Sequence, residues 1–207
     1  NKPQANLNLK QLLEAFISHR REIVTRRTVF ELRKARTRAH ILEGLAVALA
    51  NIDPVITLIK KSSSPTEAKT QLLGGVWESS VVVEMIKDAG PEISRPDNLQ
   101  HEFGLHDDGY RLSPEQAQAI LELRLQKLTG LEKDKILKEY NDLLKMITDL
   151  LDILSRPQRL MTVIHDELRD IKDQYGDERR TEIVQTQKDL SMEDLITEED
   201  VVVTLSH

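Results

Sequence analysis

The sequence predicts a mainly α-helical protein: a long antiparallel two-helix coiled-coil stalk that carries a small helical globular knob at its tip. Three observations lead to this class. Aromatic residues make up 3% of the 207 residues and charged residues 31%, a balance that suits long exposed helices better than a β-sandwich or barrel. Apolar residues recur at helical spacing over two long segments, and most turn-forming residues fall between them. A short terminal β-strand is expected in the closing run at 201–205.

The ascending stalk helix is expected in residues 1–61. Apolar residues recur there every three or four positions, which places them on one face of an α-helix. They are Leu42, Leu45, Leu49, Ile52, Ile56 and Ile59, continued upstream by Leu9, Leu12, Phe16, Ile23 and Phe30. The ring of Pro54 blocks the carbonyl four residues earlier, so a kink or a new helix is expected at Asp53.

Residues 62–130 are expected to form the globular knob. Two helix starts lie in it, each with a capping serine, a proline in the first turn and Glu or Gln three residues after the serine: Ser64-Pro65-Thr66-Glu67 and Ser113-Pro114-Glu115-Gln116. A small hairpin is expected across Gly109. The second helix should run through Leu128 and stop at Gly130.

The descending stalk helices are expected in residues 131–176. Apolar residues are spaced alternately by four and three, which is the pattern of a coiled-coil seam: Ile136, Tyr140, Leu143, Ile147, Leu150 and Leu154, then Met161, Ile164, Leu168, Ile171 and Tyr175. A break is expected near 155–157, where Ser155 would cap a new helix and Pro157 would open it. Residues 177–207 are interpreted as a return segment to the base of the stalk.

The basic stripe of the first helix has two interpretations. Residues 1–43 carry a net charge of +6, and the remaining residues carry −12. One interpretation is ion pairing between the stalk helices. In an antiparallel pair, the residue numbers of two facing positions add up to a constant, here about 191. Arg36 and Arg38 would then face the region of Asp149 and Asp152. Arg20 and Arg21 would face the region of Asp170 and Asp173. Such exposed pairs contribute only about 0–1 kcal/mol each and would mainly select the register.

The other interpretation is contact with the phosphates of double-stranded DNA through Arg26, Arg27 and Arg33. Helical arginines bind phosphates without sequence specificity and with strong salt dependence. Phe30 is the one aromatic residue within this stripe, and a single ring gives no stacking platform for the successive bases of a single strand.

The sequence assembles no catalytic, metal or cofactor site. The chain has no cysteine, which excludes disulfides, thiolate catalysis and thiolate zinc sites. The group His101, His106, Asp107 and Asp108 matches no ligand spacing and is interpreted as a solvated turn. Of the tyrosines, Tyr140 and Tyr175 are expected to pack in the seam, and Tyr110 lies beside a turn with no evident base. No run is long and apolar enough to span a membrane, and no export signal opens the chain.

The helix that follows Ser113 is apolar on more than one face, and a knob this small is expected to leave part of that surface uncovered. An uncovered apolar patch is a candidate interface. The dimer interface is therefore expected at Ile120, Leu121, Leu123, Arg124, Leu125 and Leu128. The competing interpretation is that the knob buries the whole surface.

Long stretches of the chain resemble the type IIA DNA topoisomerases. They are the segment from Arg26 to Arg36, the run Ala39-His40-Ile41-Leu42-Glu43-Gly44-Leu45, the run from Gln116 to Leu131, and the closing segment from Asp194 to His207. The resemblance covers nearly the whole chain and rests on long runs of matching residues, not on one short motif.

The resemblance implies that the parent protein is an ATP-dependent DNA topoisomerase, an isomerase in the cytoplasm, and that this part is the stalk and exit-gate knob of its breakage–reunion subunit. It also implies a homodimer through the knob. ATP and Mg²⁺ would act on another polypeptide of the enzyme, with no cofactor in this part. The family's nucleophilic tyrosine lies upstream, so no catalytic residue is expected here. Hinges are expected at Pro54, Ser155 and Pro157. The alternatives are a stand-alone coiled-coil scaffold and a helical DNA-binding module.

Overall fold

The computed structural model describes residues 7–86, 93–123, 130–182 and 204–205, and this described part is mainly α-helical. It contains seven helices and one antiparallel hairpin of β1 (Gly104–His106) and β2 (Gly109–Arg111). The hairpin across Gly109 confirms the prediction. The terminal strand was expected at 201–205. Residues 201–203 lie outside the described residues, and Thr204 and Leu205 are not in a strand. The chain divides into two compact units, residues 1–168 and 169–207.

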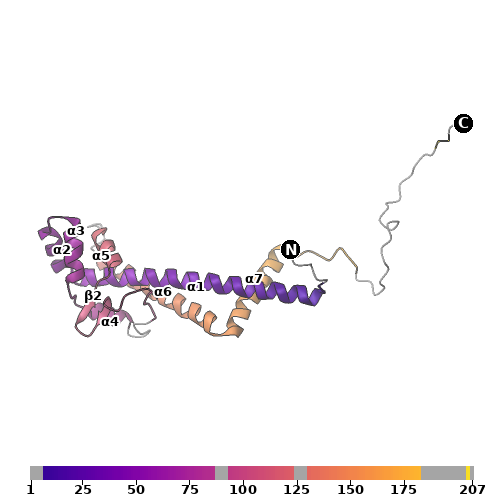
Figure 1. Cartoon of the computed structure of the whole chain (residues 1–207), viewed down its shortest axis with the longest axis horizontal. Helices are drawn as coiled ribbons and strands as arrows, with labels where there is room; N and C mark the ends of the chain where they lie inside the picture. The colour runs from indigo at the N-terminus through magenta and orange to yellow at the C-terminus, as the bar shows by residue number, and fades with distance from the viewer. Residues whose placement is uncertain (1–6, 87–92, 124–129, 183–203, 206–207) are drawn as a thin grey trace. The chain divides into compact units, whose positions relative to one another are not determined.

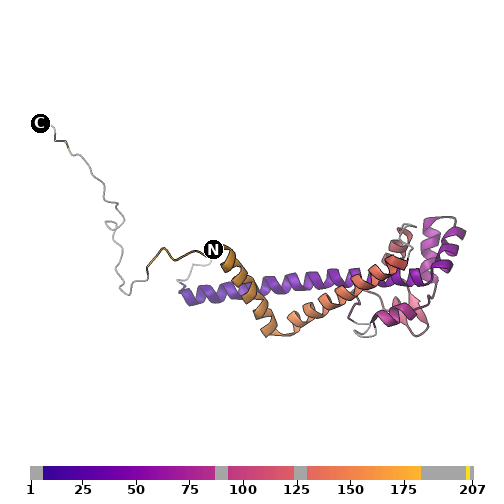
Figure 2. The same cartoon turned by 180° about the vertical axis from the view of Figure 1, so that it is seen from behind.

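Within the first unit, two helices distant in sequence lie side by side and run in opposite directions (Figures 1 and 2). Helix α1 (Leu9–Ala50) begins at a capping box formed by Asn8 and Gln11. Its partner is α6 (Gly130–Ser155). The antiparallel direction follows from the contacts, because Arg38 of α1 pairs with Glu139 and the more N-terminal Val24 packs with Ile153.

The knob segment supplies four short helices around the C-terminal half of α1 (Figure 1): α2 (Ile52–Lys61), α3 (Pro65–Gly74), α4 (Ser80–Ile86) and α5 (Pro114–Leu121). Both expected helix starts are confirmed. The Ser64 hydroxyl accepts from the Glu67 amide, and Ser113 forms a capping box with Gln116. Helix α5 is shorter than expected, ending at Leu121, and Gly130 begins α6 instead of stopping the preceding helix.

The chain turns sharply between α1 and α2, whose axes differ by 89°. The turn lies at Asn51, two residues before the expected position. Pro54 falls in the first turn of α2, where a missing N–H removes no helical hydrogen bond. The Asn51 amide side chain donates to the carbonyls of Val47 (2.9 Å) and Glu78 (3.1 Å), which holds the turn against the knob.

A second interruption separates α6 from α7 (Pro157–Tyr175), with Arg156 between them. The break falls where the sequence predicts it, but the expected cap differs. The Ser155 hydroxyl donates to the carbonyl of Asp152 (3.1 Å) at the end of α6. The Arg156 carbonyl accepts from the Leu160 amide (3.2 Å), so Arg156 stands at the start of α7.

The apolar core of the first unit has two parts. The larger joins the C-terminal half of α1, the knob and α6, with Leu42, Leu72 and Ile147 among its fully buried side chains. The smaller bridges the break at Arg156, because it joins Val24, Ile153, Leu160 and Ile164. The three helices α1, α6 and α7 are therefore held together on both sides of the interruption.

The expected apolar stripe is buried in some places and exposed in others. Tyr140, Ile147 and Leu150 are buried as predicted. The upstream part of α1 is not: the exposed side chains there are Leu9, Leu12, Phe16, Ile23 and Phe30. Beyond the break, Met161, Ile171 and Tyr175 are also exposed. The buried face of α1 instead runs through Val24, Thr28, Leu32, Ala35 and Ala39. Its small and polar members do not belong to a pattern of large apolar side chains.

Among the described helices, none is by itself long and apolar enough to cross a membrane. The bent pair α1 and α2 meets that criterion only when both helices are counted together.

Candidate interaction surfaces

A buried carboxylate on α1 links the helix pair to the knob. Glu43 is only 8% exposed, and its two oxygens accept hydrogen bonds from Ser94 (2.7 Å), Tyr110 (3.0 Å) and Tyr140 (2.8 Å). These donors lie in the loop before the hairpin, in β2 and in α6. Burial raises the pKa of Glu43, and the hydrogen bonds from the three hydroxyls partly oppose that rise.

A second set of hydrogen bonds continues from this carboxylate into α5. The Gln116 side-chain amide donates to the His40 carbonyl (2.6 Å) and to the Tyr110 hydroxyl (2.7 Å). The His40 ring lies between α1 and the start of α5, and its Nε2 atom is 2.9 Å from the Ser113 hydroxyl. Burial lowers the pKa of His40 to about 4, so the ring is neutral at pH 7.

The close approach of α5 to α1 requires a glycine. A Cβ atom on Gly44 would lie 2.6–2.8 Å from the side-chain carbons of Gln116. Because Gln116 is fully buried and hydrogen-bonded on several sides, it has little room to move away. Gly44 therefore allows the buried hydrogen-bond network to form.

Tyr110 and Tyr140 are structural. Both are buried, and burial together with the nearby Glu43 carboxylate raises the pKa of each phenol, which disfavours a phenolate nucleophile. Tyr175, expected in a packed seam, is instead 78% exposed. No base beside Tyr110 is evident in the sequence, so the buried role of Glu43 was not predicted. The signal for it was a carboxylate among the apolar residues of 41–48, on the face that packs.

The basic stripe of α1 is largely paired with carboxylates. Arg38 forms a bidentate pair with Glu139 (2.6 and 3.0 Å), Arg36 pairs with Asp97, and Arg20 pairs with Glu167 (2.6 Å). The expected partners of Arg36 and Arg38 were wrong. Asp149 and Asp152 lie further along α6 and pair with Arg156 and Arg159 instead. The helices are offset from the expected register, and Tyr140 of α6 lies opposite Glu43 of α1.

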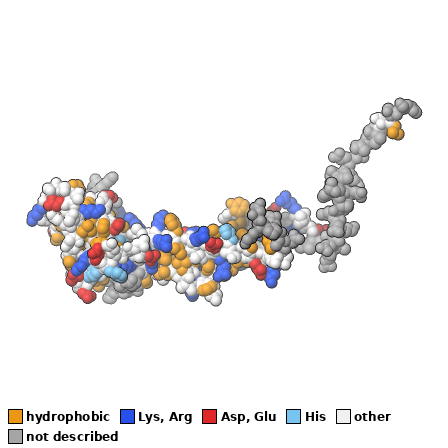
Figure 3. All heavy atoms as spheres, in the orientation of Figure 1, with side chains coloured by type: hydrophobic (Ala, Val, Ile, Leu, Met, Phe, Trp, Pro, Cys, Tyr) orange, Lys and Arg blue, Asp and Glu red, His pale blue; other side chains and the backbone are white. Residues whose placement is uncertain are grey.

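The three residues expected to contact DNA also have carboxylate partners. Arg26 pairs with Glu22, Arg27 pairs with Glu167, and Arg33 lies 3.9 Å from Asp97. Basic and acidic side chains are interspersed along this surface (Figure 3). Phosphate binding would have to compete with these pairs. Arg27 alone of the three pairs with another helix, α7; the partner of Arg26 lies on α1 itself and that of Arg33 in the loop before β1.

Three of the six expected dimer-interface residues lie at one edge of an apolar groove. Ile120, Leu121 and Leu123 line it together with α2, and its volume is about 240 Å³. Ile120 is buried at 3% exposure, whereas Leu121 and Leu123 are half-buried. Arg124, Leu125 and Leu128 lie outside the described residues.

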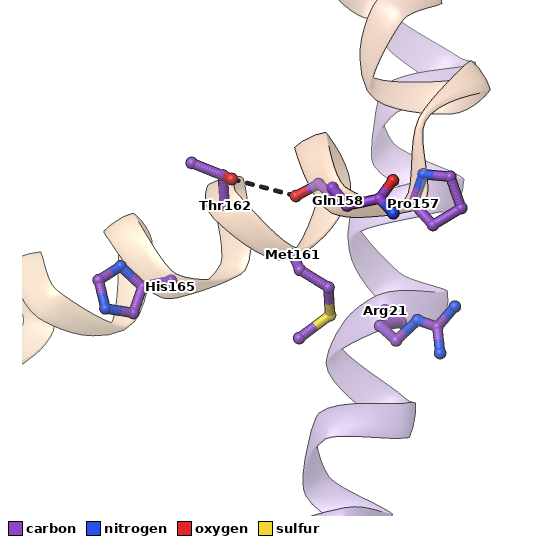
Figure 4. A pocket seen from close by; sticks show the side chains of 6 residues that line it. All are labelled: Arg21, Pro157, Gln158, Met161, Thr162 and His165. Atoms are coloured by element: carbon purple, nitrogen blue, oxygen red, sulfur yellow. Dashed lines mark hydrogen bonds between the residues drawn. The ribbon is translucent and has the colours of Figure 1, made fainter.

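A larger open hollow of about 610 Å³ lies between α1 and the start of α7. Figure 4 shows its lining, with Met161 projecting between the helices and the Thr162 hydroxyl bonded to the carbonyl of Gln158 (3.0 Å). Its two basic groups, Arg21 and His165, point away from each other (Figure 4). The hollow therefore does not focus positive charge on one point.

The expected hinge residues all lie at helix starts or ends. Pro54 is exposed in the first turn of α2, and Ser155 and Pro157 are exposed on either side of Arg156. In the described residues no group of three or more acidic or histidine side chains could hold a metal ion. His106 instead contacts the Glu102 carbonyl, and Asp108 pairs with Arg111.

Comparison with known proteins identifies the family. Residues 1–169 match the family model that describes the A subunit of DNA gyrase/topoisomerase IV. The chain is 61% identical to the DNA gyrase A subunit of Pseudomonas aeruginosa over 97% of its length, 59% identical to that of Aeromonas salmonicida over its whole length, and 58% identical to that of Escherichia coli K12 over 97%. It spans only 22–23% of the length of these relatives. The chain belongs to the family of DNA gyrase/topoisomerase IV A subunits.

Proposed function

We propose that this chain is the coiled-coil and exit-gate part of the DNA breakage–reunion subunit of DNA gyrase. In this role it holds two A subunits together and opens to release the transported duplex during ATP-dependent supercoiling. The single observation that carries the proposal is the similarity to gyrase A subunits over 97% or more of the chain. The antiparallel packing of α1 and α6, with the knob helices at one end of that pairing, supports it.

The proposed parts keep the boundaries expected from the sequence: a stalk in 1–61 and 131–176, a dimerisation knob in 62–130 and a return segment in 177–207. The knob contact closes the gate, and the stalk bends at Pro54 and at Ser155–Pro157 when the gate opens. The small core that joins Val24, Ile153 and Leu160 across the second break supports a stiff closed state. Bending of the stalk at Ser155–Pro157 during gate opening has to disrupt that cluster.

The proposal assigns no chemistry to this chain. In the parent enzyme the partners are a second A subunit, the gyrase B subunit and double-stranded DNA, in an A2B2 complex in the cytoplasm. ATP and Mg²⁺ act on the B subunit. The buried state of Tyr110 and Tyr140 is consistent with a nucleophilic tyrosine located elsewhere in the parent protein.

Sedimentation of the 207-residue chain over a range of concentrations tests the proposal. We expect reversible dimerisation that Leu123→Asp weakens, because a charge would enter the apolar groove. In the reconstituted enzyme the same substitution should reduce supercoiling and leave the DNA-independent ATP hydrolysis of the B subunit unchanged. A chain that stays monomeric at every concentration, with supercoiling unaffected by Leu123→Asp, would contradict the proposal.

A further inference from the structure

The junction between α6 and α7 is held by side chains and not by the helical backbone. The Arg156 amide donates to the Asp152 carbonyl (3.1 Å), and the Arg156 carbonyl accepts from the Leu160 amide (3.2 Å). Pro157 has no amide hydrogen to donate. Residues 150–165 are all described, and among them no main-chain hydrogen bond runs directly from one helix to the other. The angle between α6 and the start of α7 can therefore change unless side chains fix it.

Arg159, in the first turn of α7, reaches back to two carboxylates of α6. Its Nη2 atom lies 3.0 Å from Oδ1 of Asp149, and its Nε atom lies 3.9 Å from Oδ2 of Asp152. The Asp152 carboxylate also accepts a hydrogen bond from Arg156. That hydrogen bond lowers the pKa of Asp152, and the charges of Arg156 and Arg159 add to the effect. Asp149 is the carboxylate that Arg159 contacts most closely.

The ion pair between Arg159 and Asp149 depends on the bend. The two residues are ten positions apart, and in one straight α-helix they would be separated by about 15 Å along the axis. An arginine and an aspartate side chain joined by a hydrogen bond cannot span that separation. Figure 2 shows the chain changing direction between α6 and α7, which brings the two side chains together. The pair therefore belongs to the bent arrangement and is lost if the two helices straighten into one rod.

The same junction has a second fastening of a different kind. Ile153, Leu160 and Ile164 pack with Val24 of α1, so this cluster holds both helices against α1 through burial of apolar surface. The Arg159 pair acts between α6 and α7 themselves, and its side chains are 36% exposed for Arg159 and 55% for Asp149. Dissolved salt screens charges that are exposed to this degree. Ionic strength therefore separates the contribution of the ion pair from that of the cluster.

We propose that Arg159 and Asp149 form an ionic latch that favours the bent arrangement of α6 and the start of α7, and that straightening of the junction releases this latch. The stiffness of the junction then depends on ionic strength. The consequence for the gate rests on the proposed function: in that role the latch opposes a change of the stalk angle at Ser155–Pro157.

Arg159→Gln tests the latch. The chain has no cysteine, so nitroxide labels can be placed specifically at Lys145→Cys on α6 and Asp166→Cys on α7, two exposed positions. Double electron–electron resonance then gives a main distance for the bent arrangement and a minor, longer one. Arg159→Gln should raise the longer-distance population about twofold to fivefold, with an unchanged melting temperature. At about 1 M salt, where the screening length is about 3 Å, the labelled chain with Arg159 should match this variant.

A charge exchange tests the pairing of the two residues. Arg159→Asp alone and Asp149→Arg alone each bring like charges together across the bend. Each should raise the longer-distance population at least as much as Arg159→Gln. The double variant restores opposite charges at the two positions and should return the population to its original value. A role of Arg159 that does not involve its charge would not be rescued in this way.

Arg26→Gln is the matched control. Arg26 pairs with Glu22 on the same helix, so this variant removes the same charge without acting across the bend, and the distances should stay as they were. Unchanged distances in Arg159→Gln contradict the latch, and a double variant that behaves like the single ones contradicts the pairing.

The outcomes also separate the latch from the gate, because the distances are measured within one chain and need no dimer. A chain that never dimerises but lengthens on loss of Arg159 contradicts the gate and supports the latch. A chain that dimerises and keeps its bend without Arg159 contradicts the latch alone.

Discussion

The hydroxyl of Tyr140 on α6 donates a 2.8 Å hydrogen bond to Oε1 of Glu43 on α1, across 97 positions of sequence. Both residues are buried. A slip of one helical turn would move the partners about 5.4 Å apart along the axis and leave a buried carboxylate oxygen with one donor fewer. This contact therefore helps to fix the register of the two helices.

Tyr140→Phe should destabilise the chain by about 1–2 kcal/mol, because it removes one donor from a buried carboxylate while keeping the ring. The measurement is urea unfolding followed by circular dichroism. Tyr175→Phe is the control, since Tyr175 is 78% exposed, and it should leave the free energy of unfolding unchanged. Equal stability of the two variants would show that the hydrogen bond has no role in holding the helices.

Gly44→Ala should destabilise the chain by about 1–3 kcal/mol, because the new methyl group would overlap the buried Gln116 side chain. Gly74→Ala provides the matched comparison. Its Cβ would meet nothing within 4 Å, and alanine is the better helix former, so this variant should be neutral or slightly more stable. Thermal unfolding of both variants measures this: the melting temperature should fall for Gly44→Ala and stay the same or rise slightly for Gly74→Ala.

Acidification should destabilise the chain through His40. Burial lowers its folded pKa from 6.5 to about 4, so the unfolded chain takes up a proton first as the pH falls. The neutral ring thus contributes stability above about pH 6.5 that is lost as the pH falls to about 4. Compared with His40→Gln, the wild-type chain should lose about 2–3 kcal/mol of unfolding free energy between pH 7 and pH 4.5. Urea unfolding at the two pH values measures this, and parallel losses in both proteins would show that another group titrates.

Glu167→Gln should loosen the start of α7 from α1, because Glu167 pairs with both Arg20 and Arg27. These pairs are partly exposed, so the change in unfolding free energy should stay below about 1 kcal/mol and diminish at high salt. Hydrogen exchange gives the sharper measurement: amides of residues 157–168 should exchange faster, with α6 unaffected. Asp166→Asn, which removes only the adjacent contact with His165, should leave the exchange of residues 157–168 as in the wild type.

Local chemistry let the sequence predict where the helices begin and break. The serine and proline pairs at Ser64 and Ser113 begin helices through their own residues. Pro54 and Pro157 each lie in the first turn of a new helix, because proline is tolerated there and not in a helix interior. Apolar spacing also identified the buried positions Leu42 and Ile147. These features depend on residues within a few positions of one another.

Burial along α1 and the partners of its arginines depended on contacts distant in sequence. Regular spacing cannot reveal that Leu9 and Phe16 are exposed while Thr28 and Ala35 are buried, because exposure depends on what packs against each face. Arg36 pairs with Asp97 of the knob, which no helical register could predict.

The sequence by itself determined the family, the helical class and the helix starts at Ser64 and Ser113, since these follow from long matching stretches and from interactions between near neighbours. The tertiary structure alone decided the buried role of Glu43 and the joining of α2 and α5 into one groove. Both depend on residues far apart in the chain, whose desolvation and contacts exist only once the helices have packed.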